Sequence, residues 1–330
     1  MLGRIIHAQE RRHARRDTNR LVRPFEWGVN FIRAHSNGDD PRHVLSRHAE
    51  EAVRRSDEFY ALPPVADYRL DGGRLVWTSA VETPSAENNT ARARFFPAHE
   101  NRRGGRGRRG ARRAVVVLPQ WNADAESHAE LCRLLARMGV AALRVTLPYH
   151  EERRPPEIER ADHLVSSNIG RTLQSMRQAV LDTRAAVRWL REHEGYDRVG
   201  VVGTSVGSCI GFLAFVHDAS IAVGVFNHVS GYVADVAWRG ISTQHVRRGF
   251  GDAVTLDELR QYWLPISPLA YAGRLPRLPA RPMRFIAARY DLTFPRDLSR
   301  AVIAKVKQLG VPVDVAWLPC GHYTSGQRPW

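Results

Sequence analysis

A short apolar strand that ends in a serine between two glycines constrains this chain more than any other feature. Residues 199–202 are valine or glycine, and the sequence continues Gly203-Thr-Ser205-Val-Gly207 before a second apolar run. Glycines two residues either side of a serine allow a tight strand-to-helix turn that larger residues would obstruct. The pattern therefore predicts that Ser205 projects from a sheet edge, with its oxygen at the amino end of a helix.

Strand-like and helix-like segments alternate from residue 114 onward. Such alternation is typical of a mostly parallel, doubly wound α/β sheet with helices on both faces. A hairpin predicted over residues 74–96 would begin this sheet. Because crossovers are right-handed, the strands of such a sheet end at one edge, and functional side chains are expected to follow them. The remaining predicted strands cover residues 115–118, 141–147, 199–203, 219–226, 283–288 and 311–318.

Two more polar residues directly follow predicted strands. Asp291 follows one near the end of the chain, and His322 follows the last one. A serine nucleophile needs a histidine base and an acid that orients it, so Ser205, Asp291 and His322 together predict acyl-transfer chemistry. Asp235 is an alternative acid. Each residue alone also fits an ordinary role, as a turn serine, a surface histidine or a helix-capping aspartate.

The motifs around these residues resemble those of the serine α/β-hydrolases, near the esterase and dienelactone-hydrolase-like members. The segment around Asp291 reads Arg-Tyr-Asp-Leu-Thr-Phe-Pro and is similar to the family's Gly-x-x-Asp-x-x-Val-Pro, and His322 follows a glycine as in the family. The resemblance covers residues 73–330 and implies an α/β-hydrolase fold. It implies that Ser205 is the nucleophile, His322 the general base and later acid, and Asp291 the orienting acid.

The loop after the strand at residues 115–118 departs from the family's pattern. It reads Leu-Pro-Gln120-Trp121-Asn, where a His-Gly pair is usual. Backbone N–H groups aimed at the developing oxyanion are needed for acyl transfer. We expect Val206 to supply one donor and Trp121, or as second choice Gln120, to supply the other. The Trp121 indole would then line the acyl pocket.

The chain divides into a helical amino-terminal extension, residues 1–72, packed on a hydrolase domain, residues 73–330. The arginines near the start of the extension, offset by Glu10 and Asp17, are expected on a solvated helix face. Residues 24–32 concentrate aromatic and aliphatic side chains, which predicts that they dock on the main body.

A long insertion, residues 227–282, is predicted to form a lid or pocket wall over Ser205, since a plain crossover would be shorter. A helical excursion with its own small core is the alternative. Two histidines in this insertion, His228 and His245, are interpreted as structural or surface residues.

The charge of +15 favours anionic partners without choosing among nucleic acid, acidic lipid and acidic substrate. Seven arginines and four glycines fill residues 101–113. We expect an exposed loop there, either a tolerated surface feature or, through the arginines from Arg102 to Arg113, a weak contact with anionic membrane or nucleic acid. The odd number of cysteines and the lack of a signal-peptide pattern predict a cytoplasmic protein.

The sequence predicts an enzyme that cleaves a small-molecule or lipid ester through an acyl-serine, with no cofactor and no metal. No P-loop, dinucleotide fingerprint or H-E-x-x-H motif is present. Two alternatives stay open: a lipid deacylase recruited to anionic membrane by its arginine-rich segments, and a non-catalytic binding protein on a hydrolase scaffold. Thioester and amide substrates are the less favoured variants of the first interpretation.

Overall fold

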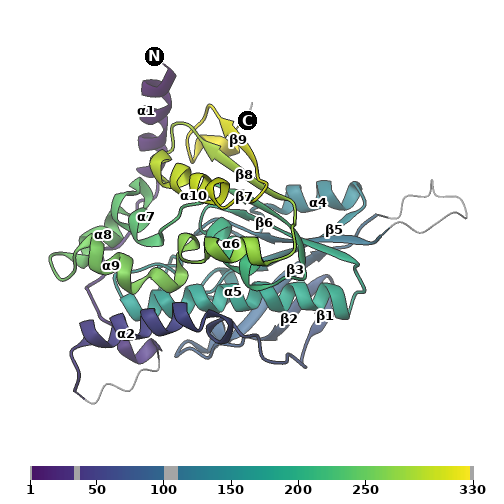
Figure 1. Ribbon diagram of the computed structural model, residues 1–330, viewed down its shortest axis with the longest axis horizontal. Helices are drawn as coiled ribbons and strands as arrows, with labels where there is room; N and C mark the ends of the chain where they lie inside the picture. The colour runs from purple at the N-terminus through teal and green to yellow at the C-terminus, as the bar shows by residue number, and fades with distance from the viewer. Residues whose placement is uncertain (1, 33–37, 100–110, 328–330) are drawn as a thin grey trace, which may run out of the picture.

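The computed structural model describes residues 2–32, 38–99 and 111–327, and a nine-stranded sheet runs through the middle of this part (Figure 1). The strands are β1 (Arg69–Asp71), β2 (Arg74–Thr78), β3 (Thr90–Phe96), β4 (Arg113–Leu118), β5 (Val140–Thr146), β6 (Arg198–Thr204), β7 (Ile221–Asn227), β8 (Met283–Ala288) and β9 (Asp314–Leu318). Their order across the sheet is β1-β2-β3-β5-β4-β6-β7-β8-β9.

The sheet is mostly parallel, as the sequence predicts. Pairings from β1 through β3 to β5 are antiparallel, and all pairings from β5 to β9 are parallel. The predicted hairpin is confirmed as β2 and β3, which pair from Arg74 with Arg94 to Thr78 with Thr90. The strand β1 was not predicted, because all three of its residues are exposed and carry no burial pattern.

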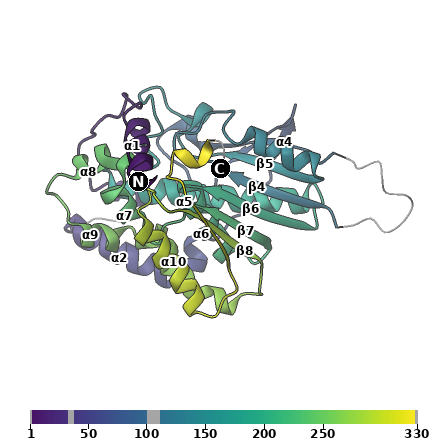
Figure 2. The ribbon, with the colours of Figure 1, turned by 90° about the horizontal axis from the view of Figure 1, so that it is seen from above.

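Helices cover both faces of the sheet (Figure 2). They are α1 (Leu2–Ala14), α2 (Pro41–Arg54), α3 (Ser56–Phe59), α4 (Ala129–Arg137), α5 (Ile169–Glu192), α6 (Val206–His217), α7 (Val233–Arg239), α8 (Gln244–Phe250), α9 (Leu256–Tyr262) and α10 (Arg296–Gln308). Side chains alternate along β4, so Val115 and Val117 pack with Cys132 of α4 on one face. Val116 and Leu118 join the larger core with α5, α6 and α10 on the other face.

The helices of the amino-terminal extension dock on the main body, while β1 at its end joins the sheet. Helix α2 begins at Pro41, where the Asp40 side chain accepts a hydrogen bond from the Arg42 backbone. Earlier in the extension, the backbone of Glu26 forms an isolated β-bridge with that of Asn168 on the main body. The prediction that Glu10 lies with the arginines on a solvated helix face is wrong, because Glu10 is fully buried. Figures 1 and 2 both place α1 near the carboxyl-terminal end of the chain.

The insertion over residues 227–282 contains α7, α8 and α9, followed by two 3-10 helices, Leu264–Ile266 and Pro268–Arg277. Its large aromatic side chains join the main core, so it has no separate small core of its own. These side chains are Phe250, Tyr262, Trp263 and Tyr271.

The arginine- and glycine-rich loop predicted over residues 101–113 lies largely outside the described residues. Arg112 is described, and its backbone N–H donates to Asp197 while its guanidinium stacks on Tyr196. No helix in the described part of the chain is long and apolar enough to cross a bilayer.

Candidate active site

Ser205 occupies the turn between β6 and α6 in a conformation that is rare for a residue with a side chain. Its φ is 58° and its ψ is −124°. A Cβ on Gly203 would lie 2.2 Å from the Gly207 carbonyl oxygen, and one on Gly207 would lie 2.4 Å from the Leu118 carbonyl oxygen. Both positions therefore require glycine, and the strain at Ser205 is held by packing on either side.

Ser205, His322 and Asp291 form one continuous chain of hydrogen bonds. His322 Nε2 lies 3.0 Å from Ser205 Oγ, and His322 Nδ1 lies 2.9 Å from Asp291 Oδ2. The three residues follow β6, β9 and β8, so the carboxyl edge of the sheet brings them together. The residues predicted as nucleophile and orienting acid are thus each within hydrogen-bond reach of the predicted base, His322.

Asp291 does not cap helix α10, whose N-cap is Pro295, but its carboxylate binds the turn before that helix. Its Oδ1 accepts hydrogen bonds from the backbone of Thr293 (2.8 Å) and Phe294 (2.7 Å), which fixes the turn after β8. Its Oδ2 is thereby aimed at His322. Asp235, the alternative acid, instead accepts two hydrogen bonds from Arg260, at 2.8 and 2.6 Å.

Burial and charge act in opposite directions on the two ionisable groups. Burial alone would lower the pKa of His322, but the Asp291 carboxylate, with its hydrogen bond, and the Glu10 carboxylate raise that pKa above its ordinary value. Burial would raise the pKa of Asp291, but the two imidazoles beside it hold the pKa well below its usual range. The pair is therefore arranged to favour an anionic Asp291 beside an imidazole that binds a proton readily.

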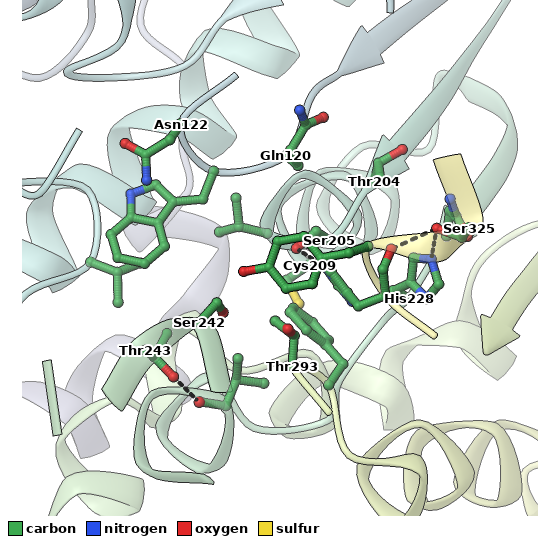
Figure 3. A pocket seen from close by; sticks show the side chains of 18 of the residues that line it. Gln120, Asn122, Thr204, Ser205, Cys209, His228, Ser242, Thr243, Thr293 and Ser325 are labelled. Atoms are coloured by element: carbon green, nitrogen blue, oxygen red, sulfur yellow. Dashed lines mark hydrogen bonds between the residues drawn. The ribbon is translucent and has the colours of Figure 1, made fainter. Parts of the chain in front are cut away.

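A second histidine shares Asp291. His228 follows β7 with a φ of 60°, and its Nδ1 lies 3.2 Å from Asp291 Oδ2. Its Nε2 lies 3.0 Å from Ser325 Oγ (Figure 3), and that hydroxyl donates to the His322 carbonyl oxygen at 2.7 Å. The interpretation of His228 as structural or surface therefore missed its link to both members of the pair.

Three possible metal ligands meet at this point: His228, Asp291 and His322 offer ligand atoms within 4.8 Å of one another. The sequence spacing gave no sign of this set, because the residues follow three different strands. Asp291 Oδ2 already contacts both imidazoles, so a metal ion would compete with the hydrogen bonds described above.

Glu10 holds the loop that carries His322. Its carboxylate accepts hydrogen bonds from the backbone N–H groups of His322 (2.8 Å), Tyr323 (3.0 Å) and Thr324 (3.0 Å). Gly321 permits this approach, since a Cβ there would lie 2.3 Å from the Glu10 carboxyl carbon. The first helix of the chain thus fixes the position of the last candidate residue.

The predicted oxyanion loop lies beside Ser205. Gln120, Trp121 and Val206 all line the same cavity as the serine. The Asn122 N–H donates to His150 Nε2 at 2.8 Å, so this N–H is not directed into the cavity. Burial lowers the pKa of His150 to about 4, which keeps its ring neutral and able to accept that hydrogen bond.

The indole of Trp121 forms part of the cavity wall, as the sequence predicts. Its Nε1 donates to the Ala161 carbonyl oxygen at 2.8 Å, and the ring stacks on His245 with centroids 5.7 Å apart. The prediction of His245 as structural or surface is correct in its first part, because this side chain is buried.

The cavity in front of Ser205 has a volume of about 490 Å³. Figure 3 shows Ser205 between Gln120 on one side and Thr293 on the other. The insertion supplies one wall, as predicted, and the amino-terminal extension supplies part of the rim. Residues from these two segments that line the cavity are Asp17, Arg20, Asn227, His228, Val233, Val236, Ala237, Ser242 and Thr243. The volume suits a small organic ligand.

Solved structures with the same architecture identify the fold. An acetyl xylan esterase from Paenibacillus sp. R4 matches with a TM-score of 0.59 and 13% identity, over 89% of this chain and 93% of that one. The chain has the α/β-hydrolase fold. A Pyrococcus horikoshii acylaminoacyl peptidase matches with a TM-score of 0.56 and 16% identity, over 82% of this chain but 39% of that one.

A Mycobacterium tuberculosis puromycin-hydrolyzing peptidase also matches, with a TM-score of 0.56 and 14% identity, over 79% of this chain and 44% of that one. The chain thus spans less than half the length of these two peptidases, and almost the whole length of the acetyl xylan esterase. No protein-family model and no curated protein matches the sequence.

Two residues of the site lie beyond what the sequence predicted. One signal in the sequence could have pointed to His228, because this residue directly follows strand β7 of the parallel sheet. Asp291 and His322 likewise come a few residues after strands β8 and β9. Glu10 carried none: it lies in a helix crowded with arginine, and its partners are backbone groups more than three hundred residues away.

Proposed function

We propose that this protein is a serine hydrolase that cleaves a carboxylic ester through an acyl-serine intermediate. The observation that carries the proposal is the unbroken hydrogen-bond chain from Ser205 Oγ through His322 to Asp291, at 3.0 and 2.9 Å. It starts at a serine with a strained backbone, at the amino end of α6, inside a cavity. A buried triad in front of a cavity is the arrangement that acyl transfer requires.

In the first half of the reaction, Ser205 Oγ attacks the ester carbonyl carbon while His322 Nε2 takes the hydroxyl proton. Asp291 stabilises the imidazolium that forms and keeps Nδ1 protonated. The carbonyl oxygen becomes an oxyanion, for which Val206 at the start of α6 and Trp121 are the assigned backbone donors. His322 then gives its proton to the departing alcohol oxygen, and the acyl group stays on Ser205.

In the second half, a water molecule attacks the acyl carbon and His322 takes a proton from it. The second tetrahedral intermediate uses the same two donors and collapses to the free acid, and the proton returns to Ser205 Oγ. With the ester and one water molecule as reactants, both halves balance to an alcohol and a free acid. Glu10 and His228 are positioning residues, because they act through the position and charge of His322. His228 does so through its contact with Asp291.

An ester is favoured over an amide by the extent of the structural matches. The acetyl xylan esterase aligns over 93% of its length. In contrast, more than half of each peptidase has no counterpart in this chain. Matched substrates test the choice: 4-nitrophenyl butyrate for the ester and butyryl-4-nitroanilide for the amide. We expect turnover of the ester and at least about a hundredfold lower kcat/KM on the anilide, because the amine leaves less readily.

Labelling with a fluorophosphonate, read by intact mass, tests the nucleophile without any knowledge of the natural substrate. We expect one adduct on the wild-type protein, none on Ser205→Ala, and much slower labelling of His322→Ala and Asp291→Asn. Folding of each variant is checked by circular dichroism. A folded wild-type protein that takes no label would exclude the hydrolase proposal and favour a binding protein on the same scaffold.

A further inference from the structure

Two guanidinium groups stand in the wall of the cavity that contains Ser205. Arg20 comes from the amino-terminal extension and Arg160 from the loop between β5 and α5, and both line the cavity. Their side chains are 13% and 10% exposed, so water solvates little of either charge. Asp17 is the only residue with a carboxylate among the described residues that line the cavity.

Arg160 is poorly satisfied for a buried cation. A guanidinium has five N–H donors, and the structure gives Arg160 one hydrogen bond inside the described chain, from Nη1 to Asn19 Oδ1 at 3.0 Å. Its Nε is buried with no partner. The nearest carboxylate oxygens, of Asp17 and Asp162, lie at 3.6 and 3.9 Å, beyond hydrogen-bond distance. A buried charge with open donors costs stability unless something else binds it.

Arg20 is held in place and shares its carboxylate. Its Nη2 donates to Asp17 at 2.8 Å and to the Tyr323 hydroxyl at 2.9 Å, while its Nε is buried without a partner. The single Asp17 carboxylate thus faces two guanidinium groups. The cavity wall keeps a surplus positive charge at a fixed position. The remaining lining combines uncharged polar side chains, such as Gln120, Asn122 and Thr293, with an apolar group made of Trp121, Val165, Val206, Val236, Ala237 and Phe294.

We propose that Arg160, assisted by Arg20, forms an anion-binding subsite, and that the substrate of Ser205 is an ester carrying a carboxylate or phosphate group away from the scissile bond. Planar guanidinium groups bind both anions through paired N–H donors. A substrate anion would use the open donors of Arg160, and the apolar wall would contact the part of the substrate between the anion and the ester. The inference rests on the proposed hydrolase function.

Five esters test the subsite, three anionic and two neutral, chosen so that the anion lies on either side of the scissile ester. 4-Acetoxybenzoate and 4-acetoxyphenyl phosphate carry it on the leaving group, and mono-4-nitrophenyl adipate carries it on the acyl group. Methyl 4-acetoxybenzoate is the neutral reference for the two esters with an anionic leaving group. Methyl 4-nitrophenyl adipate is the neutral reference for the ester with an anionic acyl group. Each kcat/KM is divided by the rate of hydroxide hydrolysis, which removes intrinsic reactivity.

We expect at least one anionic ester to exceed its neutral partner by about 10- to 100-fold in normalised kcat/KM, because charge-assisted hydrogen bonds are among the strong ones. The leading ester then distinguishes carboxylate from phosphate. Arg160→Gln should abolish this preference, so that the normalised kcat/KM of the anionic ester falls to that of its neutral reference measured with the same variant. Asp17→Asn should increase the preference, since it removes the competing carboxylate.

Arg154→Gln is the matched control, because Arg154 lies in the same loop, is exposed and does not line the cavity. It should keep the wild-type preference. Equal normalised rates for anionic and neutral esters, or a preference that survives Arg160→Gln in a folded protein, would overturn the subsite. Neutral esters and the fluorophosphonate keep the two proposals apart: if the serine takes no label and no ester is cleaved, the hydrolase proposal itself has failed.

Discussion

The Glu10 carboxylate accepts a 2.8 Å hydrogen bond from the backbone N–H of His322, a residue 312 positions later in the chain. Two more N–H groups of the same loop donate to this carboxylate, from Tyr323 and Thr324. The extension therefore belongs to the site, although it is outside the parallel sheet. The contact fixes the loop after β9, and the negative charge raises the pKa of His322.

Replacing Glu10 by glutamine should lower activity and shift its pH dependence together. The amide keeps one acceptor oxygen but presents N–H groups to the loop and removes the charge that raises the pKa of His322. We expect kcat to fall by about 10- to 100-fold, and the acid limb of kcat/KM to move to lower pH. Steady-state kinetics on 4-nitrophenyl butyrate from pH 5 to 9 measures both.

Arg12→Gln is the control for that experiment, because Arg12 is exposed on the same helix. It should leave the rate and the profile unchanged. A Glu10→Gln protein with lower activity and an unmoved acid limb would mean that Glu10 supports the fold but not the charge of the site.

The contact between Gly321 and Glu10 predicts strong non-additivity. An alanine Cβ at Gly321 would meet the Glu10 carboxyl carbon at 2.3 Å and its Oε1 at 2.5 Å, and no other residue provides its three nearest atoms. Gly321→Ala alone should therefore displace the His322 loop and reduce kcat/KM by about a hundredfold or more. Adding Glu10→Ala relieves the clash, so the double variant should lose less than the sum of the two single losses. Simple additivity would contradict the close approach.

In the proposed reaction, the raised pKa of His322 should set the pH dependence. The imidazole must be neutral to accept the Ser205 proton, so kcat/KM should rise with pH through this pKa, with a midpoint above the ordinary histidine value of about 6.5. Asp291→Asn removes the largest contribution that raises it. We expect a lower midpoint and a loss of about 10⁴ in kcat. A midpoint below 6 in the wild-type protein would be inconsistent with the buried His322–Asp291 pair.

His228 should contribute less to the rate than His322, through the Asp291 carboxylate that they share. Its Nδ1 lies 3.2 Å from Asp291 Oδ2 and its φ of 60° suits asparagine better than most residues. Because an asparagine amide nitrogen can replace Nδ1, His228→Asn should retain several-fold more activity than His228→Leu, which we expect to lose about 10- to 100-fold in kcat. Equal losses in two folded variants would show that His228 acts by packing alone.

The sequence was sufficient for the sheet, the turn at Ser205 and the positions of Asp291 and His322, because all of these follow from local patterns. Strand periodicity and two glycines predict where each polar residue leaves the sheet. The contacts of Glu10 and Arg160 depend on loops that meet only in three dimensions, and both residues look like solvated charges in sequence. The position of β1 was missed for a related reason, since its exposed residues gain nothing from burial.

Below the site, the buried pair of Arg153 and Asp182 should be essential for stability. Their side chains are 0% and 1% exposed with nitrogen and oxygen 2.9 Å apart, and Ser79 Oγ also donates to Asp182 at 2.7 Å. Arg153→Met leaves a buried carboxylate unpaired and should cost about 3–5 kcal/mol in urea unfolding, whereas the exposed Arg154→Met should cost less than about 0.5 kcal/mol.

The free energy of unfolding of the Arg153→Met protein should depend on pH. Burial already raises the pKa of Asp182 despite Arg153, and removing the guanidinium raises it further. The folded variant then binds a proton more tightly than the unfolded chain does, so its free energy of unfolding should fall as pH rises from about 5 to 8. Arg153→Met/Asp182→Leu, which has no buried charge, should recover part of the loss and be flat over this range. If the Arg153→Met protein is equally stable at the two ends of this pH range, water must reach Asp182 when the guanidinium is absent.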